Sequence, residues 1–155
     1  MSELAERYPE LNLRLATKSL AKRIAANMRR EDRDECLAEG VQPLDDILDG
    51  MICDVETYVV LWNDTPMFVW GWRPMGGGRF LWGLSTTECD RHPRAVYETG
   101  KAIVSLLLEE GCRWYGFVDE RYVRSRRWLE RIGFKVGEPF TTDNGTTLRK
   151  ITLGR

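Results

Sequence analysis

The sequence predicts a single domain of the α/β (α+β) class, built on a central mixed, mainly antiparallel twisted sheet with helices on both faces. Its 155 residues fall within the usual size of one domain. Segments with strand-like alternation dominate the middle of the chain, and helical segments flank them. A meander of strands followed by two strand–helix units implies a mixed sheet, for which we expect about six or seven strands.

The composition limits the classes of partner and compartment. Lys and Arg number 23 against 24 for Asp and Glu, so no overall field predicts a nucleic acid or an anionic membrane as partner. No apolar run approaches the roughly 18 residues of a membrane span, and the first residues are acidic, so we expect a soluble protein of the cytosol or of an assembly built there. The cysteines form no CxxC pair and only one histidine accompanies them, which predicts no metal site and reduced, mostly buried thiols at Cys36, Cys53, Cys89 and Cys112.

The first third of the chain predicts a strand followed by helices. Residues 1–10 are expected to form a flexible arm and residues 11–155 the single domain. Leucines alternate with polar residues over 11–15, as in a half-buried strand, and Thr17 stands where a helix N-cap belongs. The charged run 30–35 is typical of a second helix that ends near Gly40, and a third is expected from Pro43 to Gly50.

The middle and the end predict strands with two intervening helices. Aromatic and β-branched residues at 56–62 and 67–72 flank a turn at 63–66, which predicts a hairpin, and a third strand is expected at 79–84. A helix should open at His92-Pro93, since proline is tolerated in the first turn, and end at Gly111. The remaining elements are a strand at 113–118, a basic helix at 120–132 ending at Gly133, and a hairpin turning at Asp143-Asn144-Gly145.

This order, with the closing pair Gly133-Phe134, resembles the GNAT (N-acetyltransferase-like) superfamily, which implies the GNAT fold. The stretch from Leu15 to Pro139 is also similar to GNAT-like proteins of tailed phages, among them internal virion proteins of short-tailed phages. The residues that carry this likeness are Ala16-Thr17, Asn27-Met28-Arg29, Asp32, Glu35, Trp82-Gly83-Leu84-Ser85-Thr86, His92-Pro93-Arg94 and Trp128-Leu129 before Gly133-Phe134-Lys135-Val136-Gly137-Glu138-Pro139.

The acyl-CoA signature that the resemblance implies is incomplete. In the family, a glycine-rich loop before the long helix closes backbone N–H groups around the pyrophosphate, but here no glycine occurs between Gly83 and Gly100 and Pro93 removes a donor. If acetyl-CoA binds, the resemblance places it on the strand end at Leu84 and Ser85, with Arg91 and Arg94 as side-chain phosphate ligands.

The sequence also matches the family's catalytic residues poorly. Counting back from Gly133, the family's tyrosine acid falls on Leu129, while Tyr122 lies two helical turns away and is the remaining acid candidate. Glu88 and Asp119, at predicted strand ends, are candidate bases, with Glu56 and His92 behind them; each is also readily explained as a surface or turn residue.

Arginine crowds the helix expected at 120–132. The stripe of Arg124, Arg127 and Arg131 is a candidate surface for binding another protein, with a solvated face as the alternative and nucleic acid disfavoured by the lack of interleaved aromatic residues. Two functions remain: a virion-associated assembly protein that contacts other virion proteins in the particle interior or head-to-tail region, which we favour, and an active N-acetyltransferase that uses acetyl-CoA.

Overall fold

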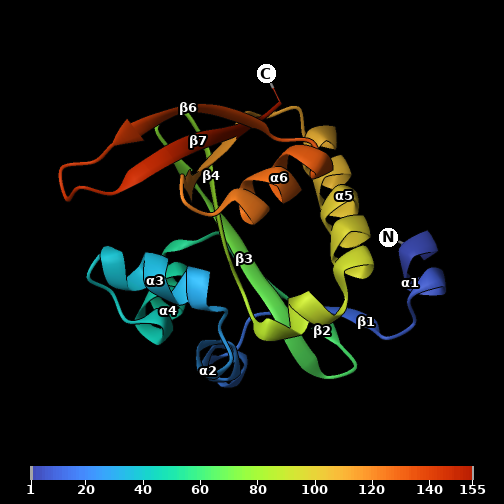
Figure 1. Cartoon of the computed structure of the whole chain (residues 1–155). Helices are drawn as coiled ribbons and strands as arrows, with labels where there is room; N and C mark the ends of the chain where they lie inside the picture. The colour runs from blue at the N-terminus through green and yellow to red at the C-terminus, as the bar shows by residue number, and fades with distance from the viewer. Residues whose placement is uncertain (1, 155) are drawn as a thin grey trace. The chain divides into compact units, whose positions relative to one another are not determined.

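The computed structural model describes residues 2–154, so Met1 and Arg155, the outer ends of the expected arm and domain, lie outside the described residues. Figure 1 shows the elements, which are in chain order α1 (Ser2–Arg7), β1 (Leu11–Leu15), α2 (Lys18–Ala26), α3 (Arg30–Ala38), α4 (Pro43–Cys53), β2 (Glu56–Trp62), β3 (Thr65–Met75), β4 (Gly78–Ser85), the 3₁₀ helix η1 (Thr87–Arg91), α5 (Pro93–Glu109), β5 (Trp114–Asp119), α6 (Val123–Ile132), β6 (Lys135–Thr141) and β7 (Thr147–Leu153).

The strands pair in the order β1-β2-β3-β4-β5-β7-β6, in one seven-stranded sheet. The pairs β1–β2, β2–β3, β5–β7 and β6–β7 are antiparallel, whereas β4 and β5 run parallel through Arg79↔Trp114 and Phe80↔Tyr115. The predicted class, a mixed and mainly antiparallel sheet with helices, is confirmed.

Most predicted elements are present, but β3 extends beyond the predicted 67–72 and the bounds of two helices were wrong. Helix α4 continues past Gly50 to Cys53, because this glycine serves a close contact: a Cβ there would lie 2.5 Å from the Trp82 ring. Helix α6 begins at Val123 instead of residue 120, since the backbone N–H of Arg121 donates to Asp119 Oδ1 at 2.9 Å and shapes a turn first.

Two further segments differ from the expectation. The segment expected as an arm holds α1, after which the Tyr8 ring lies 6.2 Å from the Trp62 ring. The connection between β4 and α5, left without an element in the sequence analysis, forms η1, whose N-cap Thr86 accepts a hydrogen bond from the Glu88 N–H.

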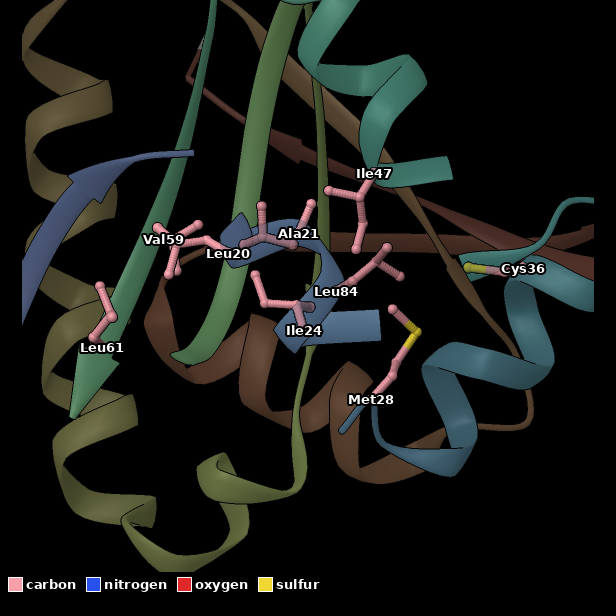
Figure 2. Packing of buried hydrophobic residues seen from close by; sticks show 10 residues of the cluster. Leu20, Ala21, Ile24, Met28, Cys36, Ile47, Val59, Leu61 and Leu84 are labelled. Carbon is pink, nitrogen blue, oxygen red and sulfur yellow. The ribbon is translucent and has the colours of Figure 1, made fainter. Parts of the chain in front are cut away.

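The chain forms two compact units, and each has its own buried apolar residues. The first unit comprises the chain up to Arg73 together with Trp82–Pro93, and the second comprises Pro74–Leu81 and Arg94 onward. In the first unit, the apolar side chains of α2 and α4 pack on β2, β3 and the end of β4, together with Met28 and with Cys36 of α3. Figure 2 shows Leu20, Ala21, Ile24, Met28, Cys36, Ile47, Val59, Leu61 and Leu84 of this cluster. Helix α2 begins as predicted, with Thr17 Oγ1 accepting from the Leu20 N–H at 3.2 Å.

In the second unit, α5 packs on β5 and against α6. Trp114 is fully buried and its indole N–H donates to the Leu107 carbonyl at 3.1 Å. A Cβ on Gly100 would lie 2.8 Å from the Trp128 ring, so α5 and α6 approach closely there (Figure 1). The candidates Asp119 and Tyr122 lie at the connection between β5 and α6.

All four cysteines are free thiols, as predicted, but only Cys36 and Cys89 are buried; Cys112 is half-buried and Cys53 exposed. Burial raises the pKa of both buried thiols to about 12. Among residues 2–154 there is no group of three or more side chains suited to hold a metal ion. None of the described helices is both long and apolar enough to span a membrane.

Candidate functional site: the edge of strand β4

The edge of β4 that faces away from β3 is occupied by the connection between α2 and α3. Thr86 donates its N–H to Met67 in β3, so the backbone groups of its neighbours Ser85 and Thr87 point to the other edge. There the Arg29 N–H donates to the Ser85 carbonyl at 2.9 Å, and the Thr87 N–H donates to the Asn27 carbonyl at 3.0 Å. Met28 and Thr86 form an antiparallel bridge between them. We call residues 27–29 the strap.

The remaining donor of this edge is bound by a buried carboxylate. The Ser85 N–H donates to Asp32 Oδ2 at 3.2 Å, and the Arg29 guanidinium binds the same oxygen at 3.0 Å. The Asp32 side chain is 11% exposed and that of Arg29 is 15% exposed. Burial raises the pKa of Asp32, although Arg29 and the Ser85 N–H act in the opposite direction. Asp32 therefore fixes the strap from the first turn of α3.

Several backbone donors of the connection from β4 to α5 are likewise engaged. Beyond Thr87, the Glu88 N–H donates to Thr86 Oγ1, the Cys89 N–H to the Thr86 carbonyl and the His92 N–H to the Cys89 carbonyl. Pro93, the first residue of α5, has no N–H. A helical turn thus stands where a glycine loop would turn its N–H groups toward a phosphate.

The candidate base Glu88 is held in a local cluster. Its Oε1 lies 3.0 Å from His92 Nε2 and its Oε2 lies 3.7 Å from Arg91, with the Glu88 side chain 17% exposed. The His92 ring stacks on the Trp62 indole with centroids 4.0 Å apart and planes 15° from parallel. His92 is the C-cap of η1, which agrees with its expected place at a turn. The cluster fixes the end of η1 to the end of β2.

The candidate base Asp119 is an anchoring residue in the second unit. Its side chain is 1% exposed and receives the Arg121 guanidinium, from Nε at 3.1 Å and Nη2 at 2.9 Å, together with the Arg121 N–H. Burial alone would raise the pKa of Asp119, but these hydrogen bonds prevail and lower it. A carboxylate held in this way is a poor proton acceptor.

Tyr122 and the other sequence candidates lie in ordinary surroundings. The Tyr122 hydroxyl accepts from Arg121 Nη2 at 3.3 Å, and its ring lies 5.2 Å below that guanidinium. Leu129 occupies the position of the family's tyrosine, half-buried in α6. Glu56 accepts from the Trp72 indole at 3.5 Å.

The two arginines predicted to hold phosphates are exposed. The Arg91 side chain is 76% exposed and binds Glu88, whereas Arg94 lies exposed in the first turn of α5, in the second unit. On α6, Arg124, Arg127 and Arg131 are all exposed, while Arg126 folds back onto the Glu120 carbonyl at 3.1 Å. The arginine stripe is therefore a surface of α6, as its spacing predicted.

Arg29 and Asp32 belong to the residues that carry the resemblance, but the sequence assigned them no role. One sequence signal could have found them. An Arg and an Asp stand three residues apart at a helix start, and both belong, like Ser85, to the residues that carry the resemblance. Only the fold shows that Asp32 reaches β4, 53 positions further along the chain.

Comparisons with known proteins show the fold of this chain. An acetyltransferase of the GNAT family from Bacillus anthracis superposes with a TM-score of 0.70 at 12% identity, covering 93% of this chain and 94% of that one. The aminoglycoside acetyltransferase AAC(6')-Ib, in complex with ribostamycin and coenzyme A, gives a TM-score of 0.66 at 16% identity and covers 94% of both chains. The same enzyme with paromomycin and acetyl-CoA gives 0.63 at 16% identity, again covering 94% of both chains.

No family model matches the sequence, and no curated protein matches it. The chain has the fold of GNAT acetyltransferases, as the resemblance implied. The two AAC(6')-Ib structures described above contain coenzyme A and acetyl-CoA.

The residues present do not fit that cofactor. The resemblance requires free backbone N–H groups on β4 and in the loop before α5. Here the N–H groups of Ser85, Thr87, Glu88, Cys89 and His92 all donate within the chain, at 3.0 to 3.3 Å. The strap also fills the edge of β4 with main chain. A ligand of this kind would have to break these hydrogen bonds and displace the strap.

Proposed function

We propose that this GNAT-fold chain works by binding other proteins, without acyl transfer, as a virion-associated assembly protein of a tailed phage, in the particle interior or the head-to-tail region. The observation that carries the first part is the occupied β4 edge. Both outward N–H groups at the end of β4, from Ser85 and Thr87, are bound by the chain's own Asp32 and Asn27.

The energetics favour the closed edge. Opening it would separate Asp32 from the Ser85 N–H and break the two backbone hydrogen bonds between the strap and residues 85–87, while the Asp32–Arg29 pair stays intact. Leaving a buried hydrogen-bonding group without its partner costs about 1–3 kcal/mol, and the binding energy of a ligand with a dissociation constant near 1 mM is only about 4 kcal/mol. An acyl carrier must therefore replace these hydrogen bonds before it can displace the strap.

The second part of the proposal, the phage particle, is supported by the sequence resemblance from Leu15 to Pro139. Two segments that carry it, Asn27-Met28-Arg29 with Asp32 and Ser85-Thr86, contact one another in the strap. A chain that has these residues, and whose β4 edge is closed to a cofactor, uses the fold as a scaffold for binding other proteins. The exposed arginine stripe of α6 supplies a surface of the kind that protein interfaces favour.

Mass spectrometry of purified particles tests this proposal together with an acetyl-transfer assay on the isolated protein. We expect the chain in the particles at a fixed stoichiometry after high-salt washing, and no transfer from acetyl-CoA to polyamine, aminoglycoside or peptide amines. The absence of the chain from particles, combined with transfer to a defined amine, would establish the acetyltransferase instead.

A further inference from the structure

A cluster of aromatic side chains on neighbouring strands forms a surface that the proposed function does not use. The aromatic patch consists of Phe80 on β4, Tyr115 and Phe117 on β5, and Phe140 on β6. The Phe80 ring lies 5.7 Å from Tyr115 and 6.3 Å from Phe117, and the Phe117 ring lies 5.9 Å from Phe140. The rings thus form one continuous row within the second unit.

The row lies on one face of the strands because side chains alternate along β5. Trp114 and Val118 point to the other face, where Trp114 is buried beneath α5, whereas Tyr115 and Phe117 share the patch. Phe117 is 43% exposed and Phe140 is 42% exposed. Phenylalanines this exposed at neighbouring positions make a contiguous apolar surface, which marks a binding site more often than chance.

The charge nearest the rings is positive. Lys150 of β7 pairs with Phe117, is exposed, and places its Nζ 5.0 Å from the centroid of the Tyr115 ring. Asp119, next on the same face of β5, is 1% exposed and neutralised by Arg121. Glu120 binds Arg149, a residue whose side chain alternates to the other face from Lys150. The charge in contact with a ring of the row is therefore cationic, and the exposed Glu138 lies two residues before Phe140 on β6.

We propose that the aromatic patch binds single-stranded nucleic acid, with bases stacking on the Phe117 and Phe140 rings and Lys150 contacting a phosphate. Adjacent rings on a sheet with a cation among them are the arrangement on which bases stack without sequence preference. A protein partner fits less well, because the cores of protein interfaces are depleted of lysine and here Lys150 stands in the middle of the row. With the chain's net charge of −1, binding rests on stacking more than on a general field.

Fluorescence anisotropy with labelled oligo-dT and oligo-rU of roughly 15 nucleotides tests the inference. We expect a dissociation constant on the order of 10 µM at low salt, with a log–log salt slope of only about −1 to −2 because one or two cations take part. The variants Phe117→Leu and Phe140→Leu keep an apolar side chain but lose the ring, and each should weaken binding about tenfold. Lys150→Gln should flatten the salt slope.

Leu108→Ala is the matched control, since Leu108 is also exposed, at 47%, but lies on α5 in the same unit. It should leave the affinity unchanged. Phe140→Leu, on a strand near the sheet edge, provides the test if Phe117→Leu does not fold, which circular dichroism will report.

Three results would overturn the inference. One is no anisotropy change at protein concentrations of about 200 µM, well above the expected constant. Another is binding that survives both ring variants but is lost when Arg124, Arg127 and Arg131 become glutamine, which would place the site on α6. The third is concentration-dependent self-association, seen by sedimentation and abolished by the ring variants, which would make the patch a protein interface.

Discussion

The backbone N–H of Ser85 donates to Asp32 Oδ2 at 3.2 Å, across 53 positions of sequence. This hydrogen bond joins the start of α3 to the end of β4 and holds the strap on the edge of that strand.

Asp32→Ala should destabilise the fold by about 3 kcal/mol, because the 15% exposed Arg29 guanidinium and the Ser85 N–H both lose the Asp32 carboxylate as acceptor. Urea denaturation measures the change. Glu31→Ala is the control: Glu31 lies 4.0 Å from the same guanidinium but is 48% exposed, so its loss should cost less than about 0.5 kcal/mol. Equal effects of the two variants would show that the buried pair does not anchor the strap.

We predict that Asp119 contributes to the free energy of unfolding at neutral pH and that this contribution is lost in acid. Its pKa is lowered in the folded protein, so its contribution is fully present above its unfolded value of about 3.9 and is lost as the pH falls through the folded pKa. Asp119→Asn should therefore be less stable than the wild type near neutral pH, and the difference should shrink below about pH 4. Thermal unfolding at a series of pH values measures this. A difference that stays constant down to pH 2, on the order of two units below the unfolded pKa, would contradict the assignment.

We predict that Gly116, beside the parallel pairing of β4 and β5, cannot be replaced by any residue with a side chain without a loss of stability. A Cβ there would lie 2.7 Å from the Leu81 carbonyl oxygen, a backbone atom that moves only with its strand. Gly116→Ala should cost about 2–3 kcal/mol, as overpacking does. Gly83→Ala, in β4, meets only ordinary contacts at 3.5 Å and beyond, and should be neutral within about 0.5 kcal/mol. Differential scanning calorimetry compares the two variants.

We predict that replacing the arginine stripe abolishes binding to partner proteins but leaves the fold intact. Changing Arg124, Arg127 and Arg131 together to glutamine should shift the thermal midpoint by only a few degrees, about 0–1 kcal/mol for each exposed side chain. Co-purification with virion components should disappear. Intact assembly together with a collapsed fold would show that the stripe is structural.

The sequence predicted the fold well where local patterns decide it. Period-two strands, the Thr17 cap and Pro93 at a helix start are local signals, and each element they indicated is present. The helix end predicted at Gly50 was wrong, because a glycine near a helix end usually terminates the helix, whereas here Gly50 makes room for the Trp82 ring. That reason is tertiary, and no spacing reveals it.

The candidate site was less predictable. Missing glycines indicated a weak phosphate loop, but the occupation of the β4 edge depends on a long-range pairing between residues 27–29 and 85–87. Glu88 and Asp119 were named as bases because carboxylates follow strands. Their partners, His92 and Arg121, lie four and two residues away and were present in the sequence, yet only the backbone turn decides that they meet.

Isothermal titration of the wild-type protein with acetyl-CoA tests the central claim most directly, that the chain itself occupies the acyl-CoA edge. We predict a dissociation constant at or above about 100 µM, or about −5.5 kcal/mol, with no further loss when Arg91 and Arg94 are changed to alanine. Low-micromolar binding that those two substitutions abolish would contradict the account, because it would show that side chains replace the missing loop and that the strap yields to the cofactor.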